Sequence, residues 1–182
     1  RCALGSKIVL AGALICAVAG CGFHLAGAVG HLPAAMHHTC IHSGEPYGHL
    51  ENLLRNAIRA SGEQVSASCE DGDAVLAIMR HSTQSRLLAV NSSGQPQEYQ
   101  LIYRVEFELR DAAGKVLLAP TRLKTQRLLA YSVNNELGTG SRRQSLVNDM
   151  QREVSRLILL RLQALDRQAV KPSAPATSQT NV

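Results

Sequence analysis

The fold of this chain is decided by the stretch Tyr99-Gln100-Leu101-Ile102-Tyr103-Arg104-Val105-Glu106-Phe107-Glu108-Leu109-Arg110. Large apolar side chains occupy every odd position, and all the even positions except Ile102 are polar or charged. Successive side chains of a β-strand point to opposite faces of a sheet. The stretch therefore predicts a long strand with one face on a hydrophobic core and the other face in solvent or on a partner.

Other extended segments surround this strand. Asp111-Ala112-Ala113-Gly114 predicts a turn, after which residues 115–132 return as a strand. Pro120 interrupts that return, which favours an edge position or a bulge because proline cannot donate to a ladder. Upstream, residues 36–42 predict a short strand, and residues 74–90 predict a longer one with a kink.

Two segments have the period of an amphipathic helix. In the first, Leu50, Leu53, Leu54, Ala57 and Ile58 line one face at the expected spacings, and Gly62 provides a stop. The second is a long helix, for which Ser141 and Gln144 predict a capping box at the start. Its apolar face is formed by Leu146, Met150, Val154, Leu157, Ile158, Leu162 and Leu165.

The element order is strand, helix, three strands, helix. This order predicts an α+β two-layer sandwich, with both amphipathic helices packed on the Tyr99/Leu101/Tyr103 face of a four-stranded, mostly antiparallel sheet. The folded domain is expected to span residues 34–168. Residues 169–182 are rich in Pro, Ser, Ala and Thr and predict a disordered tail.

The segment 1–20 has the plan of a secretory signal, with Arg1 and Lys7 ahead of an apolar run that is too short to span a bilayer. It ends in Val18-Ala19-Gly20-Cys21, which resembles the lipobox of bacterial lipoproteins. The resemblance implies cleavage before Cys21, diacylglycerol on its sulfur, and a lipidated tether over residues 21–33. By resemblance to enterobacterial sorting rules, Gly22 favours the outer membrane. The alternatives are a short membrane anchor or an ordinary secreted protein.

The composition of the chain limits which classes of ligand it is expected to bind. Residues 1–20 contain two basic and no acidic residues, which leaves 17 basic and 14 acidic side chains in the remainder, a net charge of +3. Trp is absent and aromatic residues are sparse, so stacking on nucleic-acid bases is poorly supported. Cys40 and Cys69 would lie in an oxidising compartment, where a disulfide between them is plausible. The alternative is two separately buried thiols.

Catalytic and metal-binding patterns are weak. Neither a G-x-S-x-G nor an H-E-x-x-H motif occurs, so we predict neither an enzyme nor a cofactor. Six of the seven histidines lie between His24 and His49. On a strand, His38, Cys40 and His42 would point the same way, as zinc or copper ligands could. We assign no metal, because polar residues at an exposed strand edge give the same pattern. A periplasmic ligand- or metal-binding protein using residues 24–49 is the alternative function.

Basic residues indicate an anionic ligand. Gly138-Thr139-Gly140-Ser141 precedes the expected long helix, where backbone N–H groups beside Arg142 and Arg143 could hold an anion. A simple capped turn is the alternative. Arg80 and Arg86 lie on predicted strands, and arginine forks suit phosphate groups. An ordinary solvated face is the alternative for them.

Three motifs together carry a family resemblance. Cys21-Gly22-Phe23-His24-Leu25, Leu32-Pro33 and Gln97-Glu98-Tyr99-Gln100-Leu101 resemble the LPS-assembly lipoprotein LptE family, as does the order of elements along essentially the full chain. Ala26 departs from the basic residue that the family often has there.

The resemblance implies a non-enzymatic protein, lipid-anchored through Cys21 on the periplasmic side of the outer membrane. Such a protein forms the plug of the LptD β-barrel, assists its assembly and binds lipopolysaccharide. Arg80, Arg86, Arg142 and Arg143 are the corresponding candidates for lipopolysaccharide binding. A polar outer sheet face fits this role because barrel interiors are polar.

Overall fold

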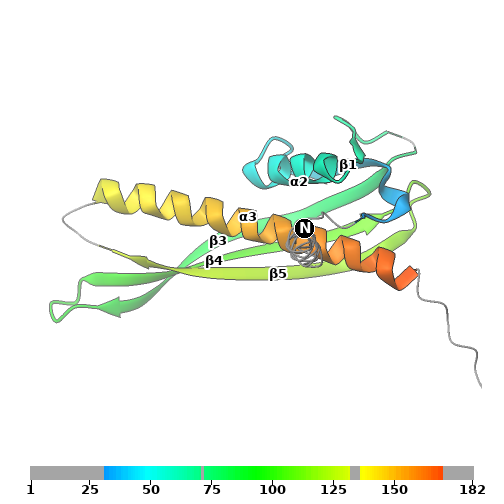
Figure 1. Ribbon diagram of the computed structural model, residues 1–182. Coiled ribbons are helices and arrows are strands. Elements are labelled where there is room, and N and C mark those ends of the chain that lie inside the picture. The colour runs from blue at the N-terminus through cyan, green and yellow to red at the C-terminus, as the bar shows by residue number, and fades with distance from the viewer. Residues whose placement is uncertain (1–30, 71, 132–135, 170–182) are drawn as a thin grey trace, which may run out of the picture.

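The computed structural model describes residues 31–70, 72–131 and 136–169 (Figure 1). Its elements are η1 (Ala34–Met36), β1 (His38–Ser43), α2 (His49–Ala60), β2 (Gln64–Val65), β3 (Ala74–Val90), β4 (Pro96–Arg110), β5 (Val116–Ala130) and α3 (Glu136–Ala169). One sheet and two α-helices confirm the predicted α+β class. Within the described residues, no helix is both long enough and apolar enough to cross a membrane.

The sheet has five strands in the order β2-β1-β3-β4-β5, so the prediction of four strands is wrong. The additional strand is Gln64–Val65, which pairs in parallel with His38 and Thr39 of β1. Two residues are too few to show a strand period, which is why the sequence did not predict it. β1 also runs parallel to β3, while the β3–β4 and β4–β5 pairs are antiparallel.

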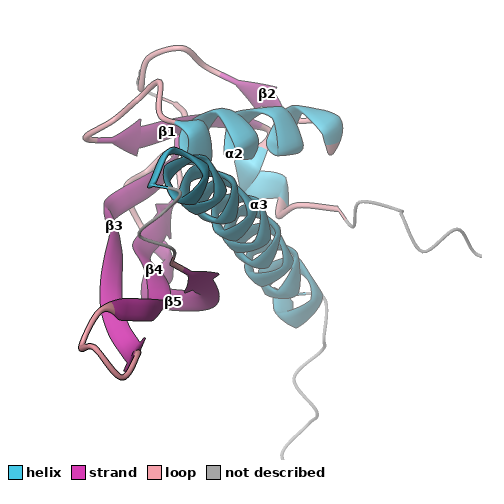
Figure 2. Ribbon diagram, turned by 90° about the vertical axis from the view of Figure 1, so that its left-hand side faces the viewer, coloured by secondary structure: helices cyan, strands magenta, loops and turns pink. Residues whose placement is uncertain are grey.

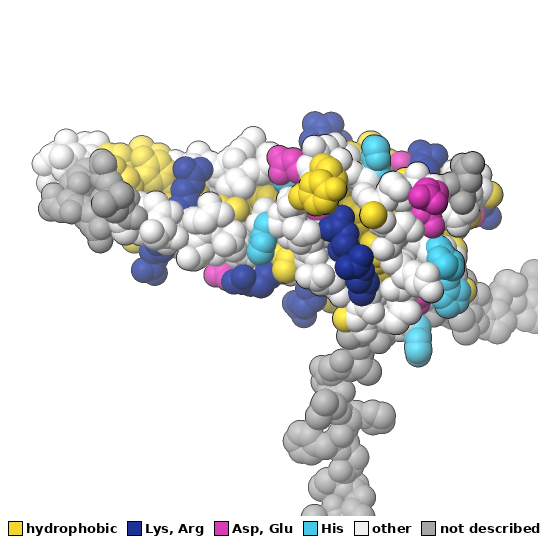
Figure 3. Space-filling view, turned by 90° about the horizontal axis from the view of Figure 1, so that it is seen from above, with side chains coloured by type: hydrophobic (Ala, Val, Ile, Leu, Met, Phe, Trp, Pro, Cys, Tyr) yellow, Lys and Arg dark blue, Asp and Glu magenta, His cyan; other side chains and the backbone are white. Residues whose placement is uncertain are grey.

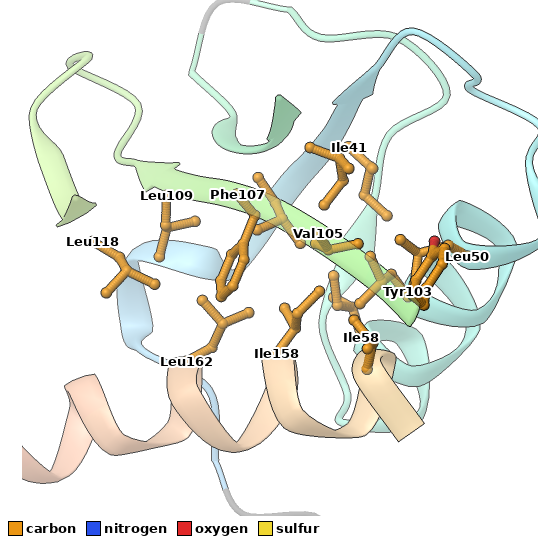
Figure 4. Close-up of a cluster of buried hydrophobic side chains, with 14 of the residues drawn as sticks. Ile41, Leu50, Ile58, Tyr103, Val105, Phe107, Leu109, Leu118, Ile158 and Leu162 are labelled. Carbon is orange, nitrogen blue, oxygen red and sulfur yellow. The ribbon is translucent and has the colours of Figure 1, made fainter. Parts of the chain in front are cut away.

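The central strand β4 behaves as its alternation predicts. Leu101, Tyr103, Val105, Phe107 and Leu109 are all buried. Both helices cover this face of the sheet, as predicted (Figure 2). In Figure 4, side chains from α2 and α3 point into the same cluster as these β4 residues. The opposite face of β3, β4 and β5 carries no helix, and we call it the open face.

A register shift in β3 decides which side chains reach each face. The pair Ile78–Phe107 is followed directly by Arg80–Glu106, which leaves Met79 as the extra residue. The strand is therefore continuous, and the expected kink is a β-bulge. Because of this bulge, Arg80 lies on the open face and His81 lies on the helix-covered face. A second shift, between the pairs formed by Leu118 and Thr121, places Pro120 at a bulge in an edge strand, as predicted.

The long helix α3 begins at Glu136, so the prediction that Ser141 and Gln144 form its capping box is wrong. Both residues lie inside the helix, where the Ser145 hydroxyl donates to the Ser141 carbonyl at 3.2 Å. The sequence pattern did not predict this first turn because it contains Gly138 and Gly140, which are poor helix formers. Each glycine costs a helix roughly 1 kcal/mol relative to alanine, an amount that tertiary packing can offset.

The two cysteines of the domain are joined in the structure. Cys40 in β1 and Cys69 in the loop before β3 form a disulfide, with their Cα atoms 5.1 Å apart. The bridge fixes that loop to a fully buried strand position. The predicted signal (1–20), the lipid site Cys21 with the adjoining tether to residue 30, and the predicted tail beyond residue 169 lie outside the described residues.

Candidate functional site

The four predicted arginines do not form one site. Arg80 and Arg86 lie on β3 with side chains on the open face. Arg142 and Arg143 lie on α3, which packs on the opposite face of the sheet. The structure therefore divides the candidates between two separate surfaces.

The first surface is a basic patch on the open face, made of Arg80, Arg104, Arg122 and Lys124. Register brings these side chains together, because Glu106 pairs with both Arg80 and Arg122, and Arg104 pairs with Lys124. The patch borders a groove of about 490 Å³. We call this group of four residues the basic patch.

One carboxylate lies within the basic patch. Glu106 forms an ion pair with Arg80, whose Nε lies 3.4 Å away, and accepts a hydrogen bond from Arg122 Nη2 at 3.1 Å. Its side chain is only 12% exposed, whereas those of Arg80 and Arg122 are 77% and 78% exposed. Arg104 donates to the neutral Gln84 amide. The patch therefore keeps an excess of positive charge at its surface, which suits anionic groups.

The second surface is a pocket at the far end of the sheet, where the β3–β4 hairpin projects beyond α2 (Figure 1). We call this projecting part the arm, and the pocket of about 390 Å³ under α3 the arm pocket. The arm pocket is lined by Ser85, Tyr99, Leu129, Tyr131, Thr139, Gly140 and Arg143.

The walls of the arm pocket come from the helix-covered face of the sheet. The rings of Tyr99 and Tyr131 meet edge to face with their centroids 5.7 Å apart, and Leu129 lies directly opposite Tyr99 on the neighbouring strand. Arg143 is exposed and is the one charged side chain among the described residues of the lining. An apolar pocket with one cation at its border suits an anionic amphiphile.

The helix geometry separates the two neighbouring arginines of α3. Consecutive helical residues point about 100° apart, as 3.6 residues per turn require. Arg143 lines the arm pocket, and Arg142 is not among the lining residues. The prediction that residues 138–141 precede the long helix is wrong. In a helix that begins at Glu136, the N–H groups of Gly140 and Ser141 already fall within the intrahelical ladder.

The histidine-rich segment does not assemble into a metal site in the part of the chain that the structure describes. The sulfur of Cys40 is committed to the disulfide, and His38 and His42 are exposed. No group of three or more His, Cys, Asp or Glu side chains in that part is placed to hold a metal ion. Histidine side chains show mostly toward the end opposite the arm (Figure 3).

The seventh histidine, His81, belongs to a polar cluster that the sequence did not reveal. His81 Nε2 lies 3.5 Å from Glu51 Oε1, and the Ser43 hydroxyl donates to the same oxygen at 2.6 Å. Glu51 is fully buried in the first turn of α2. A Cβ atom on Gly48 would stand 2.3 Å from Glu51 Oε2, so any larger residue there would have to displace the buried carboxylate. The cluster links β1, α2 and β3.

The ionisation of this cluster follows from its contacts. Burial opposes the charged form of Glu51, but hydrogen bonds with His81 and Ser43 outweigh it and lower the pKa of the carboxyl. The hydrogen bond to Glu51 raises the pKa of His81 against the opposing effect of burial. Burial also raises the pKa of the nearby Tyr103 to about 12. The pair therefore favours His81 protonated and Glu51 ionised.

Several residues of these surfaces carried a usable signal in the sequence. Leu129 and Tyr131 are two residues apart on a predicted strand, which indicates that they share a face, but nothing local shows that α3 begins early enough to cover them. Arg104 and Arg122 lie on predicted strands. Their approach to Arg80 depends on the register between strands, which a single sequence does not supply.

Comparison with known proteins gives a consistent result. A family model described as "LptE: Lipopolysaccharide-assembly" matches residues 40–162. The chain is 27% identical over 157 residues to the LPS-assembly lipoprotein LptE of Photorhabdus laumondii, which covers 85% of this chain and 83% of that protein.

Two solved structures have the same fold. Rare lipoprotein B of Shewanella oneidensis superposes with a TM-score of 0.64 at 20% identity, covering 74% of this chain and 99% of that one. Lipoprotein B of Nitrosomonas europaea gives a TM-score of 0.65 at 24% identity, covering 84% and 99% of the two chains. The matched family region, residues 40–162, contains the helices, the sheet and both surfaces described above, apart from the ends of β1 and α3.

Proposed function

This chain belongs to the LptE family of lipopolysaccharide-assembly lipoproteins, and from this premise we propose that it binds lipopolysaccharide at the arm pocket. We further propose that it forms the plug of an LptD-type outer-membrane β-barrel and assists the assembly of that barrel. Neither role involves a catalytic step or a cofactor.

The observation that carries the proposal is the combination of aromatic walls and Arg143 at the arm pocket. Lipopolysaccharide has acyl chains beside phosphate groups. The walls formed by Tyr99, Leu129 and Tyr131 suit an acyl chain, because burying apolar surface is favourable. The guanidinium of Arg143 suits a phosphate, with which it can form paired hydrogen bonds.

Two neighbouring arginines provide a matched test. We expect Arg143→Glu to weaken lipopolysaccharide binding at least about tenfold, since a charge-assisted hydrogen bond is worth roughly 1.5–3 kcal/mol and its loss is joined by repulsion. Arg142→Glu changes the net charge equally but not the pocket, and we expect an effect within about twofold. Binding is measured by titration of purified protein with lipopolysaccharide, and circular dichroism checks the fold. Equal losses in the two variants, or none in Arg143→Glu, would exclude the arm pocket as the site.

The plug role is supported by the open face. That face has no helix over it and carries the basic patch, and the interior of an outer-membrane barrel is polar. In this proposal, lipid on Cys21 holds the domain at the periplasmic side of the outer membrane, next to its barrel. Several acyl chains on one residue give stable anchoring, which one chain does not.

Co-purification tests the plug role separately from lipid binding. The tagged chain is isolated from detergent-solubilised outer membrane, and the expected companion is a large barrel protein whose gel mobility changes on heating. A Cys21→Ser variant controls for anchoring, and we expect it to be lost from the membrane fraction. A wild-type chain that is present in the outer membrane without any barrel companion would contradict the plug role.

A further inference from the structure

Strand β5 forms one edge of the sheet, and no described residue pairs with its outer side. From Thr121 to Ala130 its register with β4 is constant, without a bulge. Edge strands of this length present unpaired N–H and C=O groups, which are a template for pairing with another chain. The edge of β5 is therefore a candidate interaction surface.

The direction of each backbone group on this edge follows from one hydrogen bond. The N–H of Tyr131 donates to the carbonyl of Gln97 in β4 at 2.8 Å, so the backbone N–H and C=O groups of Tyr131 point toward β4. In an antiparallel ladder these pairs recur at every second residue. Hence Thr121, Leu123 and the following odd residues bond to β4. The N–H and C=O groups of Arg122, Lys124 and Gln126 point outward. The Gln126 carbonyl accepts from Arg127 Nη1 at 2.8 Å, so the outward donor of that residue is its N–H.

Side chains on the two sides of this edge differ in kind. On the open face, Arg122 and Lys124 are exposed beside the outward-pointing backbone groups. On the helix-covered side, a groove of about 470 Å³ runs between β5 and the second half of α3. That groove is lined by Thr121, Arg122, Leu123, Leu157, Leu160, Arg161 and Ala164, and its Leu160 is 44% exposed.

We propose that the β5 edge between residues 121 and 127 receives an extended segment of a partner protein in which acidic and apolar residues alternate. Residues of an added strand share a face with the β5 residues directly opposite. Those opposite Arg122 and Lys124 are acidic and lie on the open face. Those opposite Thr121 and Leu123 are apolar and enter the groove beside Leu160.

Charge distinguishes this partner from a second copy of the chain. Pairing β5 with another β5 would bring Arg122 and Lys124 of one copy beside the same residues of the other, and like charges across strands are destabilising. The bulge at Pro120 ends the regular edge on one side, so the docked segment is confined to the stretch after it. The inference does not depend on lipopolysaccharide binding at the arm pocket.

The test uses an eight-residue synthetic peptide that alternates valine with glutamate, and a control peptide with lysine in place of glutamate. Both are titrated into the ¹⁵N-labelled chain. We expect the glutamate peptide alone to bind and to protect the amides of Arg122, Lys124 and Gln126 from hydrogen exchange. Gln126→Pro removes one outward donor without breaking a β4 bond, and should weaken binding about fivefold, as expected for one hydrogen bond near 1 kcal/mol. Gln126→Ala keeps the N–H and should bind as the wild type does.

A second variant keeps the proposal testable if proline disturbs the strand. Lys124→Glu should weaken the glutamate peptide about fivefold and improve binding of the lysine peptide. The proposal is overturned if Gln126→Pro and Gln126→Ala bind equally, if protection appears away from β5, or if neither peptide binds. A dimer in sedimentation that Gln126→Pro dissociates would assign the edge to self-association instead. Lipopolysaccharide gives the last outcome. If it displaces the peptide, and if its own binding is unchanged by Gln126→Pro, the groove is a lipid site instead.

Discussion

The two ends of strand β3 lie in different surroundings although one continuous strand joins them. At its start, Ala74, Leu76 and Ile78 are buried beneath the helices. Toward its end, Leu87 and Leu88 are each 45% exposed and Val90 is 51% exposed. Figure 1 shows the reason, because α2 covers only the first end and the hairpin projects beyond it. We call the first region the core end, in contrast to the arm.

The contrast indicates a division of roles within one sheet. Apolar side chains at the core end are packed, so they contribute to stability. Exposed apolar side chains at the arm contribute little to stability, and a projecting apolar surface marks an interaction site. The arm pocket lies in the same region, with Tyr99 and Leu129 as its walls. The core end therefore holds the fold, and the arm carries apolar surface that the packing of the core leaves uncovered.

The largest expected effect on stability is at the core end. Phe107 is fully buried, and Phe107→Ala should lower the free energy of unfolding by about 3–5 kcal/mol, as removal of a buried aromatic ring usually does. Leu128 of β5 pairs with Gln100 at the base of the arm and is 57% exposed, and Leu128→Ala should change the free energy of unfolding by less than about 0.5 kcal/mol. Urea unfolding followed by circular dichroism measures both.

A Phe107→Leu variant keeps this comparison possible if the alanine variant does not fold. It leaves a smaller cavity, so its loss of unfolding free energy should lie between those of Phe107→Ala and Leu128→Ala. Comparable losses at Phe107 and Leu128 would mean that the arm is part of the stabilising core. The proposed division of roles would then be wrong.

Much of the fold could be predicted because its strongest signals are local. The alternation around Tyr103 gave the central strand and its buried face, and Leu50, Leu54 and Ile58 gave α2. Prediction failed where the structure depends on distant partners. β2 exists only because two residues pair with β1. The first turn of α3 contains two glycines that a local pattern reads as a loop, and contacts with the sheet override that preference.

The candidate site was less predictable than the fold. Residue type alone pointed to Arg80 and Arg143, but their placement on opposite faces follows from the bulge at Met79 and the early start of α3. The histidines drew attention to residues 24–49, whereas His81, outside that segment, is the histidine that contacts the fully buried Glu51. Glu51 fits an amphipathic helix equally well as an exposed or a buried residue of the first turn. Its burial depends on Gly48 and on β3.

The next effect in size is that of the Cys40–Cys69 bridge, which also lies at the core end. The cysteines are 29 residues apart, and chain entropy predicts a loss of about 3–4 kcal/mol in the Cys40→Ala/Cys69→Ala variant. The arm should respond little, so hydrogen exchange at Tyr99 should stay close to that of the wild type. Mass spectrometry of the native, non-reduced protein after alkylation checks the bridge. Alkylation of both cysteines would contradict it.

The smallest effect concerns pH and again belongs to the core end. The pKa of Glu51 is lowered from an ordinary value of 4.5, so its contribution is present above that pH and is lost as the pH falls through the folded value. The pKa of His81 is raised from 6.5, so its contribution is present below 6.5 and is lost as the pH rises through the folded value. The pair therefore stabilises the fold most between pH 4.5 and 6.5. The free energy of unfolding should decline above that window.

Substitutions separate this pair from the other groups that titrate in the same range. His81 faces Glu51 from α2, Glu45 at 3.8 Å and the Tyr103 ring of β4, and it is the one histidine among these neighbours. His81→Gln should therefore flatten the decline above pH 6.5. His38→Gln, an exposed change on β1, should leave the decline as in the wild type. If His81→Gln retains the full decline, the pH dependence arises elsewhere. Hydrogen exchange can also locate the decline. If protection above pH 6.5 is lost at Leu87 and Tyr99 and not at the core end, protonation controls the stability of the arm.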